Sequence, residues 1–169
     1  MKLFAIYVGG DAPGANIEVH DMRFVAASSL RETYADLRRQ WWGTPASLHI
    51  DCWADITHAD GYDVTLHAAP FVSALKLYYI NLGGYDPTEF SERHLNMFVV
   101  AETASQAKRR AKIAVTGWDQ LHRDDMYEAD QVFCLSEVAC GMQHYIHLTP
   151  SAKAETFTFT CRYTRIGKA

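Results

Sequence analysis

The sequence predicts an α+β fold made of two β-β-α-β-β repeats followed by one additional strand. The main observation is an internal duplication, because residues 2–27 and 76–101 share 11 of 26 amino acids without a gap. Chance alone gives roughly one or two identities over this length. A helix-start signal also recurs at the same point of each copy, and the 49% apolar composition supports a folded core. We therefore expect two halves related by a pseudo-twofold axis, an antiparallel-rich sheet, and helices on one face of that sheet.

Each repeat is expected to begin with two strands. The first strands, "KLFAIYV" and "KLYYINL", are apolar and rich in aromatic residues, which is typical of buried strands. A Gly-Gly pair follows each of them and predicts a turn. The second strands are predicted at 22–27 and 96–101.

A helix is predicted next in each copy, at 30–42 and at 104–116. The first helix has an apolar stripe at Leu30, Tyr34, Leu37 and Trp41, whereas that of the second is thinner and consists of Ala104, Ala107, Ala111 and Val115. Capping boxes and C-terminal glycines mark the ends at equivalent positions: Ser29, Glu32 and Gly43 in the first copy, and Thr103, Gln106 and Gly117 in the second.

A hairpin is expected to complete each repeat. In the first copy, the strand at 47–56 should return through an Asp60-Gly61 turn to a strand at 62–67, and alternation places four side chains on one face: Leu48, Ile50, Cys52 and Ala54. In the second copy, strands are predicted at 131–138 and 144–150, after an insertion at 122–130.

The chain is thus divided into repeat 1 at 1–67, repeat 2 at 76–150 and a C-terminal extension at 151–169, which we expect to pack as one compact unit. The tail "ETFTFTCRYTR" lies outside the duplication and alternates cleanly, so it predicts an added strand at an edge or a subunit contact. One side of that strand should carry Phe157, Phe159, Cys161 and Tyr163.

The doubled Gly-Gly-x-x-Pro-x-x-x-x-Glu-x-His element, "QWWGTPASLHIDCWADI" and "CRYTRIGK" together resemble a bacterial family, the domain of unknown function 1543. The resemblance spans nearly the whole chain, and it implies two tandem copies of the domain. Because that family has no established reaction, the resemblance implies no catalytic residue, substrate or cofactor.

Charge and composition narrow the classes of function. The net charge of -4 and the pI near 6.0 argue against a protein that binds nucleic acid by neutralising phosphates. No apolar stretch reaches the roughly 20 residues of a membrane-spanning helix, and the N-terminus lacks a signal-peptide pattern, so we predict a cytoplasmic location. The four cysteines form no CxxC motif, which predicts reduced and mostly buried thiols.

The strongest candidates for chemistry are Glu18 with His20 and, in the second copy, Glu92 with His94. Residues two apart in an extended segment point the same way, so each pair places a carboxylate beside an imidazole. Such a pair suits general acid–base catalysis or two of the three protein ligands of a metal. It also suits a hydrogen-bonded pair that only steadies the loop.

Two further residues, His49 and Asp51, should share the strand face opposite Leu48 and Ile50. They would form a polar cluster if that face meets Glu18 and His20, and a solvated sheet face if it does not. A similar pattern recurs at His122 and Asp124.

The other candidate ligand-binding residues are glycines and one tryptophan: Gly9, Gly10, Gly83, Gly84 and Trp42. Glycine-lined loops can bind anions, but without a following helix start or a P-loop pattern a plain turn explains the pairs better. Trp42 follows the core stripe of the first helix and can line a pocket or an interface. No residue is assigned as a metal ligand, and no cofactor is identified.

Three functions follow from these features. The first is a small-molecule or anion-binding, regulatory module with a pocket near each Gly-Gly pair. The second is a hydrolase or lyase that uses the Glu-x-His pairs, and whether the protein is an enzyme stays open. The third is a structural protein that forms a homodimer through the C-terminal strand. No nucleic-acid or membrane partner is expected.

Overall fold

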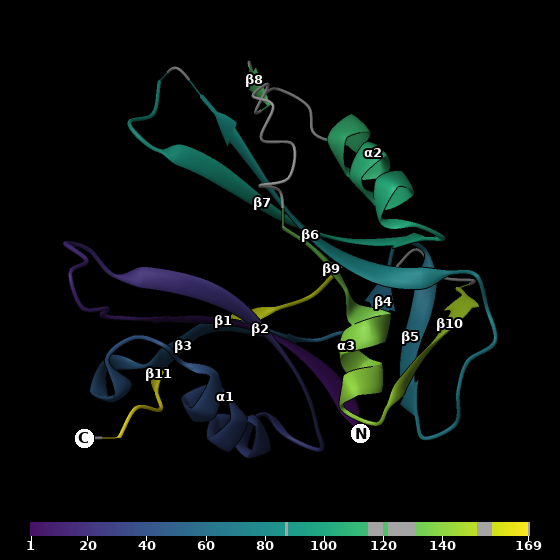
Figure 1. Ribbon diagram of the computed structural model, residues 1–169, viewed down its shortest axis with the longest axis horizontal. Helices are drawn as coiled ribbons and strands as arrows, with labels where there is room; N and C mark the ends of the chain where they lie inside the picture. Colours follow the sequence, from purple (N-terminus) through teal and green to yellow (C-terminus); the bar gives the residue numbers. More distant parts are fainter. Residues whose placement is uncertain (87, 115–119, 122–130, 152–156, 169) are drawn as a thin grey trace.

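The computed structural model describes residues 1–169 except for 87, 115–119, 122–130, 152–156 and 169 (Figure 1). It is an α+β structure in which all strand pairs in the described part are antiparallel. The strands are β1 Lys2–Gly10, β2 Val19–Ala27, β3 His49–Asp55, β4 His58–Ala59, β5 Tyr62–His67, β6 Lys76–Tyr85, β7 Glu92–Ala101, β8 Gln120–Leu121, β9 Gln131–Cys134, β10 Tyr145–Pro150 and β11 Thr160–Arg165. The helices are α1 Tyr34–Gln40, α2 Ala104–Ala114 and α3 Leu135–Gly141, with 3-10 turns η1 Leu30–Thr33 and η2 Pro45–Ser47.

The first sheet has the strand order β11-β3-β1-β2. Alternate residues of β1 face opposite sides of this sheet, as strand geometry requires. Phe4, Ile6 and Val8 face one side, where Leu37 of α1 and Trp41 complete a buried cluster. The predicted apolar stripe of the first helix is therefore buried as expected.

Another sheet is built from the second copy, in the order β7-β6-β8, with β9 also paired to β6. Tyr78, Ile80 and Leu82 face α2, and the small side chains of Ala107 and Ala111 let that helix lie close to the strands. Each of the two long hairpins thus has its own helix on its outer face, α1 on the first and α2 on the second.

The hairpins β1–β2 and β6–β7 have the same register, displaced by 74 residues. Lys2 pairs with Ala27 in the first, and Lys76 pairs with Ala101 in the second. The duplicated sequence therefore encodes the same local pairing twice, because the same alternation of apolar and polar residues fixes which side chains face inward.

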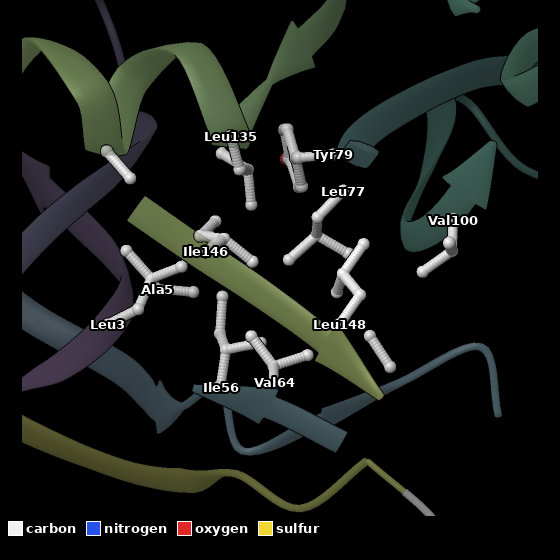
Figure 2. Close-up of a cluster of buried hydrophobic side chains, with 12 residues drawn as sticks. Leu3, Ala5, Ile56, Val64, Leu77, Tyr79, Val100, Leu135, Ile146 and Leu148 are labelled. Atoms are coloured by element: carbon white, nitrogen blue, oxygen red, sulfur yellow. The ribbon is translucent and has the colours of Figure 1, made fainter. Parts of the chain in front are cut away.

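The central core lies between these two sheets and a third one of order β10-β5-β4 (Figure 2). Leu3 and Ala5 from β1 and Leu77 and Tyr79 from β6 share one cluster. Figure 2 shows Ile146 of β10 among them, beside the end of α3. The inner faces of both hairpins and the third sheet therefore enclose one hydrophobic core.

The predicted arrangement of a sheet with helices on one face needs correction. The described strands form three sheets, and α1 and α2 cover different ones. The strand at 62–67 forms as predicted, but it pairs with β10 and β4 and not with β3. The turn at Asp60-Gly61 is confirmed, with positive φ at both residues, and it joins β4 to β5. A two-residue β4 was not foreseen, and it redirects the chain into another sheet.

In the second copy, the predicted strand at 131–138 is wrong beyond Cys134. The chain turns there into α3, so the predicted hairpin across Ala139–Gly141 is absent from the described structure. Leu135 and Ala139, one helical turn apart, are fully buried in the central core. Burial of this face selects a helix over the strand that the apolar run suggested.

The glycine pairs are not turns. Gly9 and Gly10 lie inside β1, and Gly83 and Gly84 lie inside β6, paired to neighbouring strands. β1 ends at Gly10 and β6 ends at Tyr85, one residue after Gly84, so the hairpin turns follow the glycines. Each predicted Gly-Gly turn is therefore part of an extended strand.

The helix ends follow the capping predictions in part. The Thr103 hydroxyl accepts a hydrogen bond from the amide of Gln106 at 3.2 Å, as a capping box requires. The Ser29 side chain makes no such bond, and Glu32 instead accepts from the amide of Ser28. α1 ends at Gln40, and Gly43 lacks the positive φ of a C-terminal cap. Val115 and Gly117 lie outside the described residues.

A β-bulge at Asp51 overturns the predicted faces of β3. Tyr7 pairs with Cys52 and Val8 pairs with Ile50, so Asp51 has no partner on β1. A bulge residue shifts the alternation by one position. Ile50 therefore packs with α1, whereas Cys52 lies on the opposite side of the sheet, and the predicted single apolar face is wrong.

The C-terminal strand is confirmed as an edge strand, because β11 pairs only with β3 in the described first sheet. The prediction of reduced thiols is contradicted. Cys52 and Cys161 are directly opposite each other on β3 and β11, and they form a disulfide. This pairing brings the two Cβ atoms close enough for the bond, which spacing in the sequence did not reveal.

None of the helices in the described part of the chain is long and apolar enough to cross a membrane. Arg110 of α2 forms an ion pair with Asp60 at 2.8 Å. That contact joins α2 to the β4–β5 turn.

Candidate functional site

Two histidines flank a glycine in a row across three neighbouring strands. Gly9 of β1 pairs with His20 of β2 on one side and with His49 of β3 on the other. Residues paired across antiparallel strands point to the same face of a sheet. Because Gly9 has no side chain, the two imidazoles approach each other over it.

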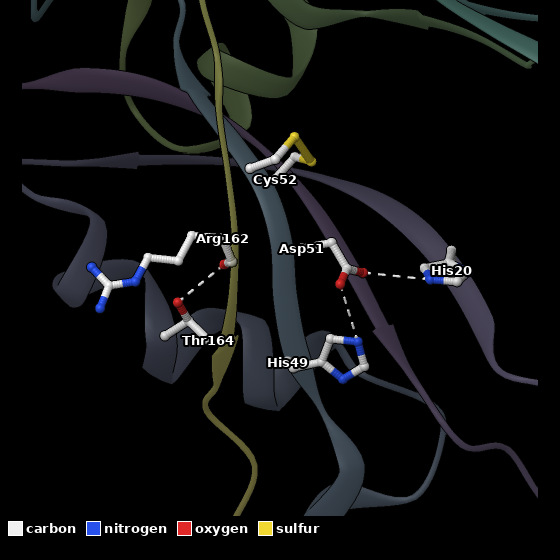
Figure 3. Close-up of a disulfide and its surroundings, with 7 residues drawn as sticks. His20, His49, Asp51, Cys52, Arg162 and Thr164 are labelled. Atoms are coloured by element: carbon white, nitrogen blue, oxygen red, sulfur yellow. Dashed lines mark hydrogen bonds and ion pairs between the residues drawn. A yellow bond between two sulfur atoms is a disulfide. The ribbon is translucent and has the colours of Figure 1, made fainter.

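Two carboxylates complete this cluster. Glu18 precedes His20 by two residues and turns to the same face, and one of its oxygens, Oε1, lies 2.8 Å from His49 Nε2. Asp51, re-aimed by the bulge, lies 3.4 Å from Nε2 of each histidine, and Figure 3 shows its side chain between the two rings. We name Glu18, His20, His49 and Asp51 the acid–histidine cluster. The sequence predicted a polar cluster if the face of His49 and Asp51 meets Glu18 and His20, and the structure brings these four side chains together.

His49 is the most buried member, with 4% of its side chain exposed. Its Nδ1 lies 2.9 Å from the carbonyl oxygen of Ser47. Since a carbonyl only accepts hydrogen bonds, Nδ1 carries a proton and donates it there. The ring of Tyr163 from β11 packs against the imidazole, with centroids 4.5 Å apart. The orientation of His49 Nε2 toward the cluster is therefore fixed from two sides.

Tyr7 supports the other histidine. Its ring stacks on that of His20, with centroids 5.2 Å apart and planes within 3°. Burial raises the pKa of the Tyr7 phenol, and the carboxylates of Asp51 and Asp21 raise it further. The phenol therefore stays protonated over a wide pH range and serves as a neutral wall of the site.

A cleft opens between the inner faces of the two long hairpins, beside the acid–histidine cluster. It consists of adjoining cavities of about 360 Å³ and about 270 Å³, which share Tyr7, Met22, His94 and Asn96. His20 lies at the wall of the smaller cavity, whereas Phe98 and Phe159 line the larger one. We call this space the inter-hairpin cleft. It offers an apolar floor with imidazole and amide groups around it.

The Glu-x-His pair of the second copy has different surroundings. His94 Nε2 lies 3.5 Å from Glu92, and its Nδ1 lies 3.1 Å from the side-chain oxygen of Asn81. The side chain of His94 is 53% exposed. Among the described residues, the group of three potential metal ligands lies in the first copy and does not include this pair. His122 and Asp124, the predicted counterparts of His49 and Asp51, lie outside the described residues.

Other predicted binding residues are placed elsewhere. Gly10 faces Trp41 and Ser47 on the α1 side of the sheet, away from the cluster. Trp42 is exposed and stacks on Trp41, so it does not line the inter-hairpin cleft. Gly83 pairs with His94 as Gly9 pairs with His20.

Four residues of the site were not predicted from the sequence: Tyr7, Asn96, Phe98 and Tyr163. A signal for Tyr7 was present, because it lies two positions before Gly9 in a strand and so shares its face. Asn96 and Phe98 relate to His94 in the same way. Tyr163 gave no such signal, since its contact with His49 depends on how β11 pairs with β3.

The comparisons with known proteins bear on family and fold. Residues 15–66 match the family described as Domain of Unknown Function (DUF1543), within the first copy of the duplication. The chain is 31% identical to protein Il1583 from Idiomarina loihiensis, whose crystal structure it matches over 99% of both chains with a TM-score of 0.74. The chain belongs to the same family as Il1583. No curated protein matches it significantly.

The DUF1543 match contains all four members of the acid–histidine cluster. The predicted resemblance to this family is thereby confirmed for residues 15–66. The match with Il1583 extends the shared fold to nearly the whole chain, including the strands that form the inter-hairpin cleft. No function is established by either comparison.

Proposed function

We propose that the protein binds a small organic molecule in the inter-hairpin cleft. The observation that supports this most is the combined cavity, whose walls come from both copies of the duplication. Small-molecule sites are typically concave, mainly apolar and bounded by a few polar groups, as this cleft is. The pair of related Glu-x-His elements then serves a single site with two unlike sides.

The chemistry of the walls limits the ligand. Phe98, Phe157 and Phe159 lie on the larger cavity and suit an apolar or aromatic group. Asn81 and His94 supply amide and imidazole groups on the smaller one. Free anions are disfavoured beside Glu18 and Asp51, because like charges repel there. We therefore expect a flat apolar moiety with a polar group directed to the His94 side.

The test uses a fluorescent apolar probe, 8-anilinonaphthalene-1-sulfonate, followed by displacement with a panel of metabolites. Phe98→Ala should weaken probe binding by about tenfold or more, since a buried aromatic contact contributes about 1.5–3 kcal/mol. Trp42→Ala is the matched control, because Trp42 is an exposed aromatic residue outside the cleft. Equal binding by the Phe98 variant and the original protein would contradict the proposal.

A second candidate is a hydrolase or lyase activity. It is favoured by the 2.8 Å contact between Glu18 Oε1 and His49 Nε2, which is the geometry of a general acid–base couple. Activity panels on Glu18→Gln, His20→Ala and the second-copy variants Glu92→Gln and His94→Ala would test it. Unchanged turnover in all four variants would remove catalysis by the Glu-x-His pairs.

We also propose that the two copies arose by duplication of a β-β-α-β-β unit and pack about a pseudo-twofold axis. The identical register of the β1–β2 and β6–β7 hairpins supports this, as does the helix on one face of each. Expression of residues 1–67 alone is the test, with a soluble dimer as the expected product. An unfolded monomer at high concentration would argue against a self-complementary unit.

A homodimer through the C-terminal strand is a further proposal. β11 lies at the edge of the first sheet, and Phe159 and Tyr163 expose 64% and 65% of their surfaces. Exposed edge strands are prone to pair with another chain. Light scattering should give a dimer mass, and truncation after Pro150 should abolish it.

We propose a cytoplasmic location for the protein. The Cys52–Cys161 disulfide is more typical of oxidising compartments, so this proposal needs a direct test. Alkylation of free thiols in intact cells before lysis would separate the cases. Alkylation of Cys52 and Cys161 would indicate reduced thiols and a cytoplasmic location. Absence of alkylation would indicate an intact disulfide and an oxidising compartment.

A further inference from the structure

Three of the four members of the acid–histidine cluster present ligand atoms that lie within 4.8 Å of one another, namely those of Glu18, His20 and His49. Glu18 and His20 lie at the start of β2, and His49 starts β3, so two elements hold the set together. Two imidazoles and one carboxylate form a common set of protein ligands for a transition metal in an enzyme or binding site.

The orientation of His49 points to an ion at this place. Its Nδ1 donates to the Ser47 carbonyl, so in the neutral ring Nε2 carries a lone pair. That lone pair faces Glu18 Oε1 at 2.8 Å, and a carboxylate oxygen also presents lone pairs. Two acceptors at this distance need a shared proton or a cation between their lone pairs. A backbone carbonyl bound to the far nitrogen is the usual partner of a metal-bound histidine.

The distances in the cluster suit the first-row metals. Ligand atoms about 2.0–2.1 Å from a tetrahedral ion are roughly 3.4 Å apart. The contacts of His49 Nε2 with Glu18 and of His20 Nε2 with Glu18 are 2.8 Å and 3.9 Å, which bracket that value. Small rotations of the Glu18 side chain, which is 43% exposed, would equalise them.

Gly9 leaves the room that such an ion needs. A Cβ atom built on Gly9 would lie 2.8 Å from His49 Nε2, 2.9 Å from Asp51 Oδ2 and 2.9 Å from His20 Cδ2. Any other residue would place its side chain among these groups. The duplicated glycine therefore has a specific role in the first copy, where it is the floor between both imidazoles.

Asp51 adds negative charge without belonging to the three-ligand set. Its Oδ2 atom is buried and has no hydrogen-bond partner among the described residues. A buried carboxylate oxygen that accepts no hydrogen bond costs free energy, and a nearby cation offsets that cost. Asp51 lies 3.4 Å from both imidazole Nε2 atoms, so its negative charge would act directly on an ion bound between them.

We propose that Glu18, His20 and His49 bind one divalent transition-metal ion of the Zn²⁺ class, with Asp51 as the adjoining carboxylate. This inference goes beyond the proposed ligand binding, since it concerns the ion alone. The ion lies beside the inter-hairpin cleft and leaves a coordination position for water or for a donor atom of a bound molecule. The described part of the second copy offers no comparable set of three ligands.

The experiment is calorimetric titration of the tag-free, chelator-treated protein with ZnCl₂, with Cys52–Cys161 left oxidised. We expect one high-affinity site per chain. His20→Ala should weaken Zn²⁺ binding by more than about 100-fold, since losing a ligand exceeds the about 10–100-fold effect of losing its supporting partner. His94→Ala is the matched control at the equivalent position of the second copy, and it should leave the affinity and the stoichiometry unchanged.

A second measurement guards against misfolding of a variant. Co²⁺ replaces Zn²⁺ in such sites, and its visible absorption reports tetrahedral coordination by the protein. The spectrum should appear in the original protein and in His94→Ala, and it should be lost in Glu18→Gln with the thermal unfolding of the metal-free protein unchanged. Absence of a high-affinity Zn²⁺ site in the original protein would overturn the proposal, as would equal affinities for His20→Ala and His94→Ala. Binding of the apolar probe by metal-free protein is measured separately, so either proposal can fail alone.

Discussion

The two long hairpins share one sequence pattern and one register, yet their Gly-Gly ends differ in chemistry. At the first, His20 and His49 approach across Gly9, and two carboxylates surround them. At the second, His94 contacts Glu92 and Asn81 and is half exposed. The residue pair Glu-x-His is identical in both places, so the pair alone does not make the site.

The strands beside the two hairpins differ in the described part of the chain. β3 runs beside β1 along most of its length and brings His49 opposite Gly9. Beside β6, β9 pairs from Tyr78 to Asn81, and the two-residue β8 pairs at Gly84 and Tyr85. The surroundings of the repeated Glu-x-His pair therefore depend on the strands beside it, and variants of both copies would measure how far they have diverged.

The largest effect is expected from removing the Cys52–Cys161 disulfide, which clamps only the first hairpin's sheet. The bond joins positions 109 residues apart, and closing a loop of that length stabilises the folded state by about 5 kcal/mol in the chain-entropy view. The double variant Cys52→Ala/Cys161→Ala should lose about that much in urea-induced unfolding. Cys134→Ala, which removes a partly buried free thiol, is the control and should cost less than about 2 kcal/mol. Equal losses would mean that the bond contributes little.

A smaller but symmetrical effect is expected in the shared core. Leu3 and Leu77 are equivalent positions of the two copies and are both buried in the central cluster. Leu3→Ala and Leu77→Ala should each cost about 3 kcal/mol, because each leaves a cavity in the same core. Urea unfolding followed by fluorescence should show a single transition in both variants. Two separate transitions would show that the halves fold independently.

A still smaller effect, on Zn²⁺ affinity, is expected from the residues that contact His20 and His94. Tyr7 and Asn81 are equivalent positions, but Tyr7 stacks on His20 whereas Asn81 contacts His94 by a hydrogen bond. Tyr7→Asn should weaken Zn²⁺ binding by about tenfold, as expected for loss of an orienting neighbour. Asn81→Ala should leave Zn²⁺ affinity unchanged. A decrease of the same size in both variants would erase the proposed difference between the two ends.

The smallest effect concerns the dependence of stability on pH. Because burial, followed by Asp51 and Asp21, raises the pKa of Tyr7, its phenol keeps its proton in the folded state. The unfolded chain loses that proton near pH 10, so it binds fewer protons than the folded protein above this pH. Stability should therefore be fully present below about pH 10 and fall as pH rises toward the folded pKa.

Urea midpoints measured at about pH 9 and about pH 10.5 would check this fall. Tyr7→Phe should show a shallower decrease than the original protein, since it lacks the phenol. Asp51→Asn should lower the pKa of Tyr7 toward its ordinary value in an ultraviolet titration. An unchanged pKa of Tyr7 in the Asp51→Asn variant would contradict the predicted electrostatic effect of Asp51 on the phenol.

Much of the local structure was predictable because it depends on neighbouring residues. The hairpins, the stripe through Leu37 and the turn at Asp60-Gly61 follow from alternation, helical spacing and backbone preferences. The hypothesis of a cluster from Glu18, His20, His49 and Asp51 also came from local spacing. It required one assumption that spacing does not supply, namely that β2 and β3 flank β1.

The failures share a physical cause, which is competition among contacts distant in sequence. The run 131–138 became partly helical because Leu135 and Ala139 are buried on one side of a core formed by all three sheets. The bulge at Asp51 broke a regular alternation, and β5 joined β10 instead of β3. Each outcome depends on which apolar surfaces of the folded chain remain to be buried, and a short stretch of sequence does not encode this.

The amino-acid sequence by itself determined the duplication, the α+β class, the two hairpins and the residue types that converge around Gly9. Only the tertiary structure decided that one copy of the Glu-x-His pair meets a second histidine, that the cysteines of β3 and β11 bond, and that a cleft opens between the hairpins. The reason is that backbone preferences act over a few residues, whereas strand order is chosen by burying apolar surface of the whole chain at once.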